Sequence, residues 1–198
     1  MKKLSILISI IVLSCGSGGE SPKDRVQTIS KSVLMVIAPT DFQDDEFRTP
    51  YDSLTKAGVD VTVASTDTTP AKGMFGMVVK PDAMLEQVRV DDYDALVVVG
   101  GSGCEILWDN GVLHEIVRHF DSQDKLIAAI CLAPITLGRA GILVDKIVTA
   151  HPAVRDEIGK CCMRCTEAQI EISGNIITCS GPKSSASFAS AILNALSK

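Results

Sequence analysis

Short apolar runs alternate with amphipathic stretches along most of this chain. The runs are rich in β-branched residues and have the length of buried strands; they are Val33–Ala38, Val59–Ala64, Ala95–Val99, Leu126–Ile130 and Ile147–Thr149. Three segments between them have helical periodicity; they are Asp45–Ala57, Ile106–Phe120 and Pro134–Ala140. This alternation predicts an α/β fold in which helices cover both faces of a mainly parallel sheet.

The remaining patterned segments add a hairpin and a closing helix. Gln169–Ile172 and Ile176–Cys179 flank the turn residues Ser173–Asn175, which predicts an antiparallel pair of strands. Ser185–Leu196 has one apolar side and is predicted to be the last helix. Gly73–Val79 is predicted to be either a small hairpin or an edge strand.

Composition indicates one folded domain. The chain has 198 residues and is 46% hydrophobic, which suits a single core, expected over residues 31–198. Its net charge is −5 and its sequence pI is near 5.2. Because no dense run of Lys and Arg is present, nucleic acid is not an expected partner.

Residues 1–14 are predicted to be a lipoprotein signal peptide. Lys2 and Lys3 precede the apolar segment Leu4–Leu13, which is far shorter than the ~20 residues of a transmembrane helix. Val12-Leu13-Ser14-Cys15 resembles the bacterial lipobox, which implies lipidation of Cys15. Residues 15–30, rich in Gly and Ser, are expected to be a flexible tether.

This N-terminus predicts an exported bacterial lipoprotein on the periplasmic or cell-surface side. Its contact with the membrane would be the lipid anchor only. The alternative is an ordinary secretory signal in which Cys15 has no such role.

Cys131 lies where the strand Leu126–Ile130 gives way to the helix that begins near Pro134. Backbone N–H groups and the helix dipole at such a junction stabilise a thiolate, so we expect Cys131 to be a nucleophile with a depressed pKa. The same geometry occurs in the nucleophile elbow of hydrolases. The alternative is that Cys131 is one more small buried residue.

Three other segments are expected at the same edge of the sheet, because ligands gather at the carboxyl ends of parallel strands. Glu46 follows the first strand, Gly100 and Gly101 end the third, and His151 follows the fifth. Each also has a simpler interpretation: Glu46 as a solvated acid near a helix start, the glycines as a tight turn, and His151 as an inert loop residue.

The order of these segments resembles the ThiJ/PfpI superfamily, and specifically the branch of the Parkinsonism-associated deglycase. VLMVIAPTDFQDDEFRTPYDSLTKAGVDVTVAS, which contains Glu46, resembles the opening strand, helix and strand of that branch. DYDALVVVGGSG resembles the strand that ends in paired glycines. KLIAAICLAPITLGRAGIL carries the nucleophile, IVTAHPAVRDEI resembles the segment with the active-site histidine, and GNIITCSGPKSSASFASAILNAL resembles the closing strand and helix.

The resemblance implies a flavodoxin-like three-layer sandwich, of the class I glutamine amidotransferase-like type. It implies that the Cys131 thiolate adds to a small reactive carbonyl, converting a 2-oxoaldehyde or its protein adduct to a hydroxy acid without a metal or organic cofactor. Glu46 and His151 would move protons, and backbone N–H groups of Gly100, Gly101 and Leu132 would hold the oxyanion. It also implies a homodimer.

Two other functions remain open from the sequence: a redox-sensing or protective protein oxidised at Cys131, and an amidase-type hydrolase. Leu132 stands where the protease-like branch has a histidine, which argues against a peptidase. GMFGMVVKPDA lacks the arginine that lines the pocket in the deglycase branch.

Seven cysteines are present, and three of them form the cluster Cys161, Cys162 and Cys165. A zinc site would need a fourth ligand that is not evident. A disulfide, for instance between Cys162 and Cys165, is compatible with export. The third interpretation is that the cluster has no role.

Overall fold

The computed structural model describes residues 30–198. The predicted signal peptide, the lipidation site at Cys15 and the tether, except for its last residue, lie outside this range.

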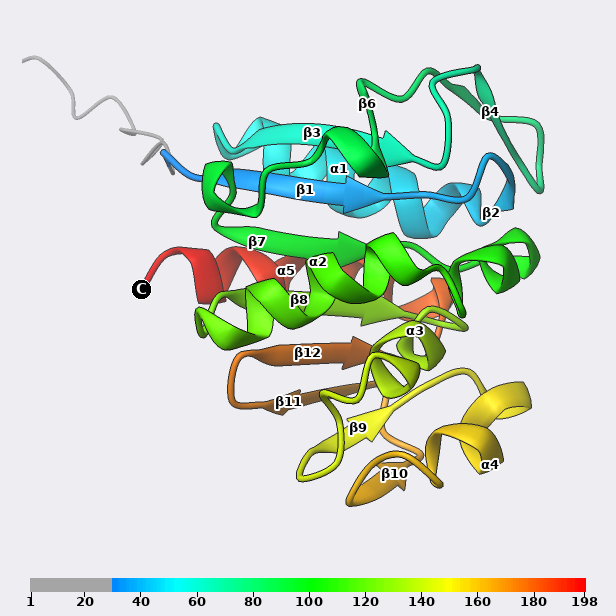
Figure 1. The fold of residues 1–198 in the computed structure, drawn as a ribbon, viewed down its shortest axis with the longest axis vertical. Helices are drawn as coiled ribbons and strands as arrows, with labels where there is room; N and C mark the ends of the chain where they lie inside the picture. The colour runs from blue at the N-terminus through cyan, green and yellow to red at the C-terminus, as the bar shows by residue number, and fades with distance from the viewer. Residues whose placement is uncertain (1–29) are drawn as a thin grey trace, which may run out of the picture.

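A seven-stranded sheet forms the centre of the molecule, with the strand order β11-β12-β8-β7-β1-β3-β6 (Figure 1). Its strands in chain order are β1 (Ser32–Val36), β3 (Asp60–Ser65), β6 (Ala83–Met84), β7 (Ala95–Val98), β8 (Leu126–Ile130), β11 (Ile170–Ser173) and β12 (Ile176–Cys179). Every neighbouring pair is parallel except β11 and β12, which form the predicted hairpin. The sheet is therefore mainly parallel, as the alternation of segments predicts.

Helices cover both faces of this sheet. The helices are α1 (Asp44–Lys56), α2 (Gly111–Ser122), α3 (Pro134–Arg139), α4 (Arg155–Ile158) and α5 (Ser185–Leu196). Along β1, Val33 and Met35 pack in the same core as α1 and α5, whereas Leu34 and Val36 pack with α2 and α3. Because both faces of β1 are buried, its sequence is continuously apolar. The three-layer sandwich is confirmed (Figure 1).

Two sequence predictions are corrected by the fold. Ile147–Thr149 is a strand, β9, but it pairs with β10 (Arg164–Thr166) in a separate two-stranded sheet. The position beside β8 in the central sheet is occupied by β12. The helix predicted from Ile106 begins only at Gly111, because Asn110 caps it by accepting the Leu113 N–H at 2.9 Å.

Short strands and 3₁₀ segments connect the larger elements. β4 (Ala71–Gly73) and β5 (Val78–Val79) form a hairpin, so the hairpin alternative for Gly73–Val79 is the correct one, and β4 also pairs with β2 (Thr40–Phe42). Five 3₁₀ segments lie between the larger elements: η1 (Leu85–Gln87), η2 (Val90–Asp92), η3 (Ser102–Leu107), η4 (Pro152–Val154) and η5 (Pro182–Ser184).

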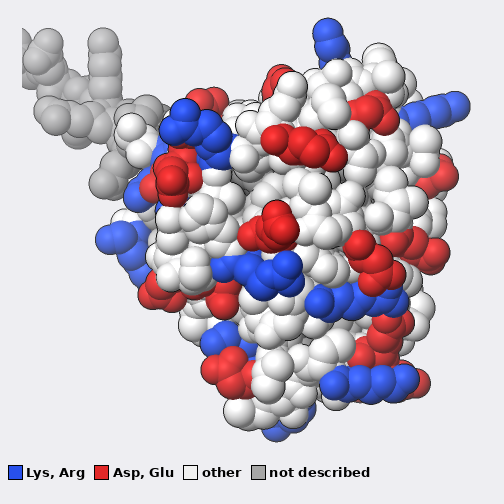
Figure 2. All heavy atoms as spheres, viewed as in Figure 1, with Lys and Arg blue, Asp and Glu red and all other residues white. Residues whose placement is uncertain are grey.

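Positive and negative side chains are interspersed on the face that Figure 2 shows. Within residues 30–198, no helix combines the length and apolar character needed to cross a bilayer.

Candidate active site

Five of the residues selected from the sequence line one pocket at the carboxyl edge of the sheet. Its volume is about 310 Å³. The complete lining is Gln43, Glu46, Met74, Phe75, Gly101, Ser102, Cys131, Leu132, His151, Ala153 and Pro182. The structure thus brings together Glu46, Gly101, Cys131, Leu132 and His151, which come from four separate segments.

Cys131 occupies a strained turn between β8 and α3. Its φ angle is 65°, in the left-handed region that non-glycine residues rarely adopt. Its backbone N–H donates to the Cys179 carbonyl oxygen at 2.8 Å, which ties the turn to the end of β12. A nucleophile elbow has this arrangement of strand, sharp turn and helix.

Glu46 lies behind Cys131 and is fully buried. Neither carboxyl oxygen has a hydrogen-bond partner of normal geometry. Gly100 allows the two side chains to approach, since a Cβ atom there would lie 2.5 Å from Glu46 Oε2 and 2.7 Å from Cys131 Cβ. The Gly100 N–H faces the Glu46 carboxyl, and Gly100 does not line the pocket. The oxyanion role expected for Gly100 stays a prediction, whereas Gly101 lines the pocket directly.

Burial governs the protonation of this pair. It raises the pKa of the Glu46 carboxyl from 4.5 to about 7, against opposing interactions with Cys131 and with the Gly100 backbone. Burial also raises the pKa of the Cys131 thiol, and the neighbouring Glu46 carboxylate raises it further. The Gly101 N–H interacts with the sulfur and lowers the pKa of the thiol, which offsets part of this increase.

The depressed pKa expected for Cys131 is therefore wrong. Only 7% of the residue is exposed, and α3 begins three residues later and has only six residues. Desolvation outweighs the donors at the helix start. The Glu46 carboxylate and the Cys131 thiolate repel each other, so the two groups titrate as a coupled pair. When Glu46 is protonated, its repulsion of the thiolate is absent.

The raised pKa of Glu46 predicts a stability that depends on pH. The native state binds this proton more tightly than the unfolded state, so the stabilisation is complete below pH 4.5 and is lost as pH rises through about 7. We expect the free energy of unfolding to fall by about 2–3 kcal/mol between pH 5 and pH 8. Urea denaturation of wild type and Glu46→Gln measures this, and the variant should lack that decrease.

Asp52→Asn is the matched control, because Asp52 is an exposed carboxylate on the same helix. It should keep the wild-type dependence. If the free energy of unfolding depends on pH equally in wild type and in Glu46→Gln, the assignment of this proton to Glu46 is wrong.

His151 enters the pocket from the loop after β9. Its backbone N–H donates to the Cys131 carbonyl oxygen at 2.9 Å. Its Nδ1 accepts the Ala153 N–H at 3.3 Å, which places the proton of the neutral ring on Nε2. The side chain is half-buried and lines the pocket, so Nε2 is available as a proton donor.

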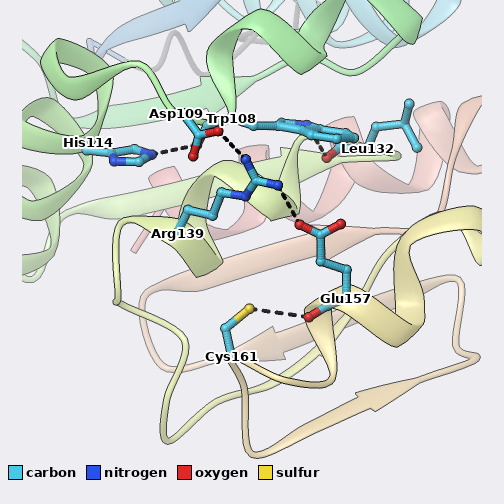
Figure 3. A network of polar contacts seen from close by, with 7 residues as sticks. All are labelled: Trp108, Asp109, His114, Leu132, Arg139, Glu157 and Cys161. Atoms are coloured by element: carbon cyan, nitrogen blue, oxygen red, sulfur yellow. Dashed lines mark hydrogen bonds and ion pairs between the residues drawn. The ribbon is translucent and has the colours of Figure 1, made fainter.

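A polar network anchors Leu132, the residue that follows Cys131 (Figure 3). Trp108 Nε1 donates to the Leu132 carbonyl oxygen at 3.2 Å. The Arg139 guanidinium lies 5.3 Å from the Trp108 ring centre and pairs with Asp109 and, at 2.7 Å, with Glu157. Sequence reasoning missed this support, because the partners are far apart in the chain.

The six described cysteines are free thiols. The Cys161 thiol donates to the Glu157 carbonyl oxygen at 3.4 Å, and Cys162 and Cys165 pack half-buried against the core. Cys104 is buried near Glu46, and burial raises its pKa to about 12. Within residues 30–198, no group of three or more His, Cys, Asp or Glu side chains is arranged to hold a metal ion.

Sequence reasoning also missed part of the pocket lining: Gln43, Met74, Phe75, Ser102, Ala153 and Pro182. Pro182 could have been found, because Gly181-Pro182 comes two residues after the end of β12, a strand parallel to β8, and such strand ends line ligand sites. Met74 and Phe75 lie in GMFGMVVKPDA, the segment that the resemblance places beside the pocket, but the pattern of the sequence alone did not select them.

Comparison with known proteins agrees with this architecture. Residues 31–195 match the model of the DJ-1/PfpI family. An uncharacterized protein of Methanocaldococcus jannaschii is 37% identical over 202 residues, covering 100% of this chain and 98% of that protein. The glutathione-independent glyoxalase DJR-1.2 of Caenorhabditis elegans is 31% identical, covering 84% of this chain and 89% of the relative.

The crystal structure of the ThiJ/PfpI domain protein from Brachyspira murdochii superposes with a TM-score of 0.82 at 30% identity. The superposition covers 85% of this chain and 97% of that one. Sequence and fold together show that the chain belongs to the DJ-1/PfpI family.

Proposed function

We propose that this protein is a cofactor-independent glyoxalase or deglycase in which Cys131 is the nucleophile. The observation that carries the proposal is the position of Cys131, at a positive-φ turn, beside the buried Glu46 carboxyl and in a pocket that also contains His151. The name of the C. elegans relative, a glutathione-independent glyoxalase, supports the same reaction class.

The proposed reaction begins with addition of the Cys131 thiolate to the aldehyde carbon of a 2-oxoaldehyde, which forms a C–S bond and turns the aldehyde oxygen into an alkoxide. The hydrogen on that carbon then moves as a proton to the neighbouring carbonyl carbon, and the oxygen there takes up the proton that the thiol gave up, giving a thioester of the hydroxy acid. Water hydrolyses the thioester and releases the thiol. The sum is oxoaldehyde plus water to hydroxy acid, so no external oxidant is needed.

The remaining residues have separate tasks in this proposal. Glu46, with a pKa of about 7, exchanges a proton with the sulfur at neutral pH. The backbone N–H groups of Gly101 and Leu132 stabilise the alkoxide. His151 carries the proton that must move on the bound adduct, because its side chain lines the pocket from a different segment than the elbow and its Nδ1 is already occupied by the Ala153 N–H.

The test is conversion of methylglyoxal by the purified protein, followed as lactate formation. A second candidate is a redox sensor, which the unpartnered carboxyl beside the sulfur favours, since a protonated Glu46 can donate to a Cys131 sulfinate. Two equivalents of hydrogen peroxide would supply the two oxygens and leave as water. A stable mass gain of two oxygens on Cys131, without turnover of any oxoaldehyde, would favour the sensor.

We also propose that the protein is exported and anchored to a membrane through lipidated Cys15. Support comes from the basic start, the short apolar segment and the lipobox-like residues before Cys15. The homodimer implied by the family resemblance is a further proposal, which light scattering can check.

Lipidation predicts that Cys15→Ser accumulates as an unacylated species when expressed in a bacterial host. Wild type should partition with membranes and show an added acyl mass in intact-mass spectrometry. Absence of acyl chains on wild type would leave only the simpler secretory signal.

A further inference from the structure

An exposed aromatic side chain stands at the opening of the pocket. The Phe75 loop, residues Gly73–Met77, connects β4 to β5 and contributes Met74 and Phe75 to the pocket lining. Phe75 is 74% exposed and Met74 is 43% exposed. Large apolar side chains with this exposure beside a pocket are available to contact a ligand.

The Phe75 loop is held in place from beneath. Asp44 is only 5% exposed, and its carboxylate accepts the Phe75 N–H at 2.9 Å and the Met77 N–H at 2.8 Å. The Met74 N–H donates to the Phe42 carbonyl oxygen at 2.9 Å. Gly73 is required here, since a Cβ atom would lie 2.5 Å from Asp44 Oδ2. The main chain at Phe75 is therefore held in place before any substrate arrives.

The rest of the lining, as formed by the described residues, offers no Lys or Arg side chain to an anionic arm of a substrate, and Glu46 is an acid. Apolar surface comes from both sides: Met74 and Phe75 on the loop, and Leu132 and Pro182 at the ends of β8 and β12. An apolar arm of a substrate would lose water contact here, whereas a carboxylate or phosphate would find no counter-charge.

We propose that Phe75 and Met74 select substrates whose reactive carbonyl bears an apolar, uncharged arm, with aryl 2-oxoaldehydes preferred over methylglyoxal and over anionic carbonyl compounds. Asp44 is a positioning residue that acts through the Phe75 loop. The substrate preference rests on the proposed glyoxalase function, but the shape and charge of the pocket do not.

The first experiment measures kcat/KM for phenylglyoxal and methylglyoxal. Wild type should prefer phenylglyoxal, and Phe75→Ala should reduce the ratio of the two values about tenfold, mainly through KM for phenylglyoxal. Asp44→Asn should shift the ratio in the same direction while kcat for methylglyoxal is retained. Val78→Ala is the matched control, because Val78 lies on the same hairpin, is 65% exposed and does not line the pocket.

The second experiment needs no turnover. Alkylation of Cys131 is followed with N-phenyl iodoacetamide, iodoacetamide and iodoacetate, each rate being divided by the rate with free cysteine. In wild type, the normalised rate should be highest with N-phenyl iodoacetamide and lowest with iodoacetate. Phe75→Ala should reduce the ratio of the N-phenyl iodoacetamide rate to the iodoacetamide rate.

The two experiments separate the possible failures. No turnover of any oxoaldehyde, together with the expected alkylation preference, would reject the proposed function and retain the selectivity of the pocket. Turnover with unchanged ratios in Phe75→Ala would reject the selectivity and retain the function. A changed solution mass of Phe75→Ala with unchanged ratios would place Phe75 in a contact between subunits and would also reject the selectivity.

Discussion

Cys131→Ser should lower lactate formation from methylglyoxal by about a thousandfold or more, to the background of the uncatalysed reaction. The proposed covalent adduct requires a thiolate, and a serine hydroxyl in the same buried position gives up its proton far less readily than a thiol. Serine is close in size to cysteine, so the elbow should retain its turn. Turnover at saturating substrate and thermal unfolding of the same preparation measure the two effects.

Cys161→Ser is the matched control, since Cys161 is a half-buried thiol outside the pocket whose hydroxyl replacement can still donate to the Glu157 carbonyl oxygen. It should keep wild-type turnover. Residual activity of Cys131→Ser above one tenth of wild type would mean that another group attacks the substrate.

His151→Ala should lower the same turnover by on the order of 100-fold while Cys131 reacts with iodoacetamide at nearly the wild-type rate. The two outcomes differ because the hydrogen bond from His151 to the elbow comes from its backbone N–H, which alanine retains. The side chain that is removed lines the pocket and is the proposed proton carrier. Steady-state kinetics and mass-spectrometric labelling on one preparation test both.

His119→Ala controls for loss of a histidine, because His119 is exposed on α2 and does not line the pocket. Its turnover should be unchanged. If His151→Ala turns over at the wild-type rate, His151 has no part in proton transfer. If it slows alkylation as strongly as turnover, His151 activates the thiol instead.

The strands of the central sheet could be predicted because burial on both faces makes each one a continuous apolar run. Leu126–Ile130 is the clearest case, since the predicted and observed bounds of β8 coincide. The convergence of Glu46, Gly101 and Cys131 could also be predicted, because each follows a parallel strand of the central sheet and these strands end at the same edge. His151 follows β9, which lies outside that sheet, so the same reasoning does not place it.

Other features depend on contacts between distant parts of the chain. Ile147–Thr149 has the pattern of a central strand, but the place it would take is filled by β12. The pKa of Cys131 depends on burial by surrounding segments and on Glu46, none of which is visible in the sequence beside the cysteine. Likewise, the contact between Asp44 and the Phe75 loop joins residues about 30 positions apart.

The separation of β9 from the central sheet has a consequence for how such a site can change. The nucleophile belongs to the core of the domain, where most substitutions would disturb packing on both faces of the sheet. His151 comes from the loop after β9, which lies outside the central sheet, and is joined to the elbow by one main-chain hydrogen bond. Its neighbours Val148, Ala150 and Val154 are buried in the core, but its own side chain is half-buried and lines the pocket. The side chain at position 151 can therefore be exchanged without opening a cavity in the core, while the cysteine and its acid stay in place.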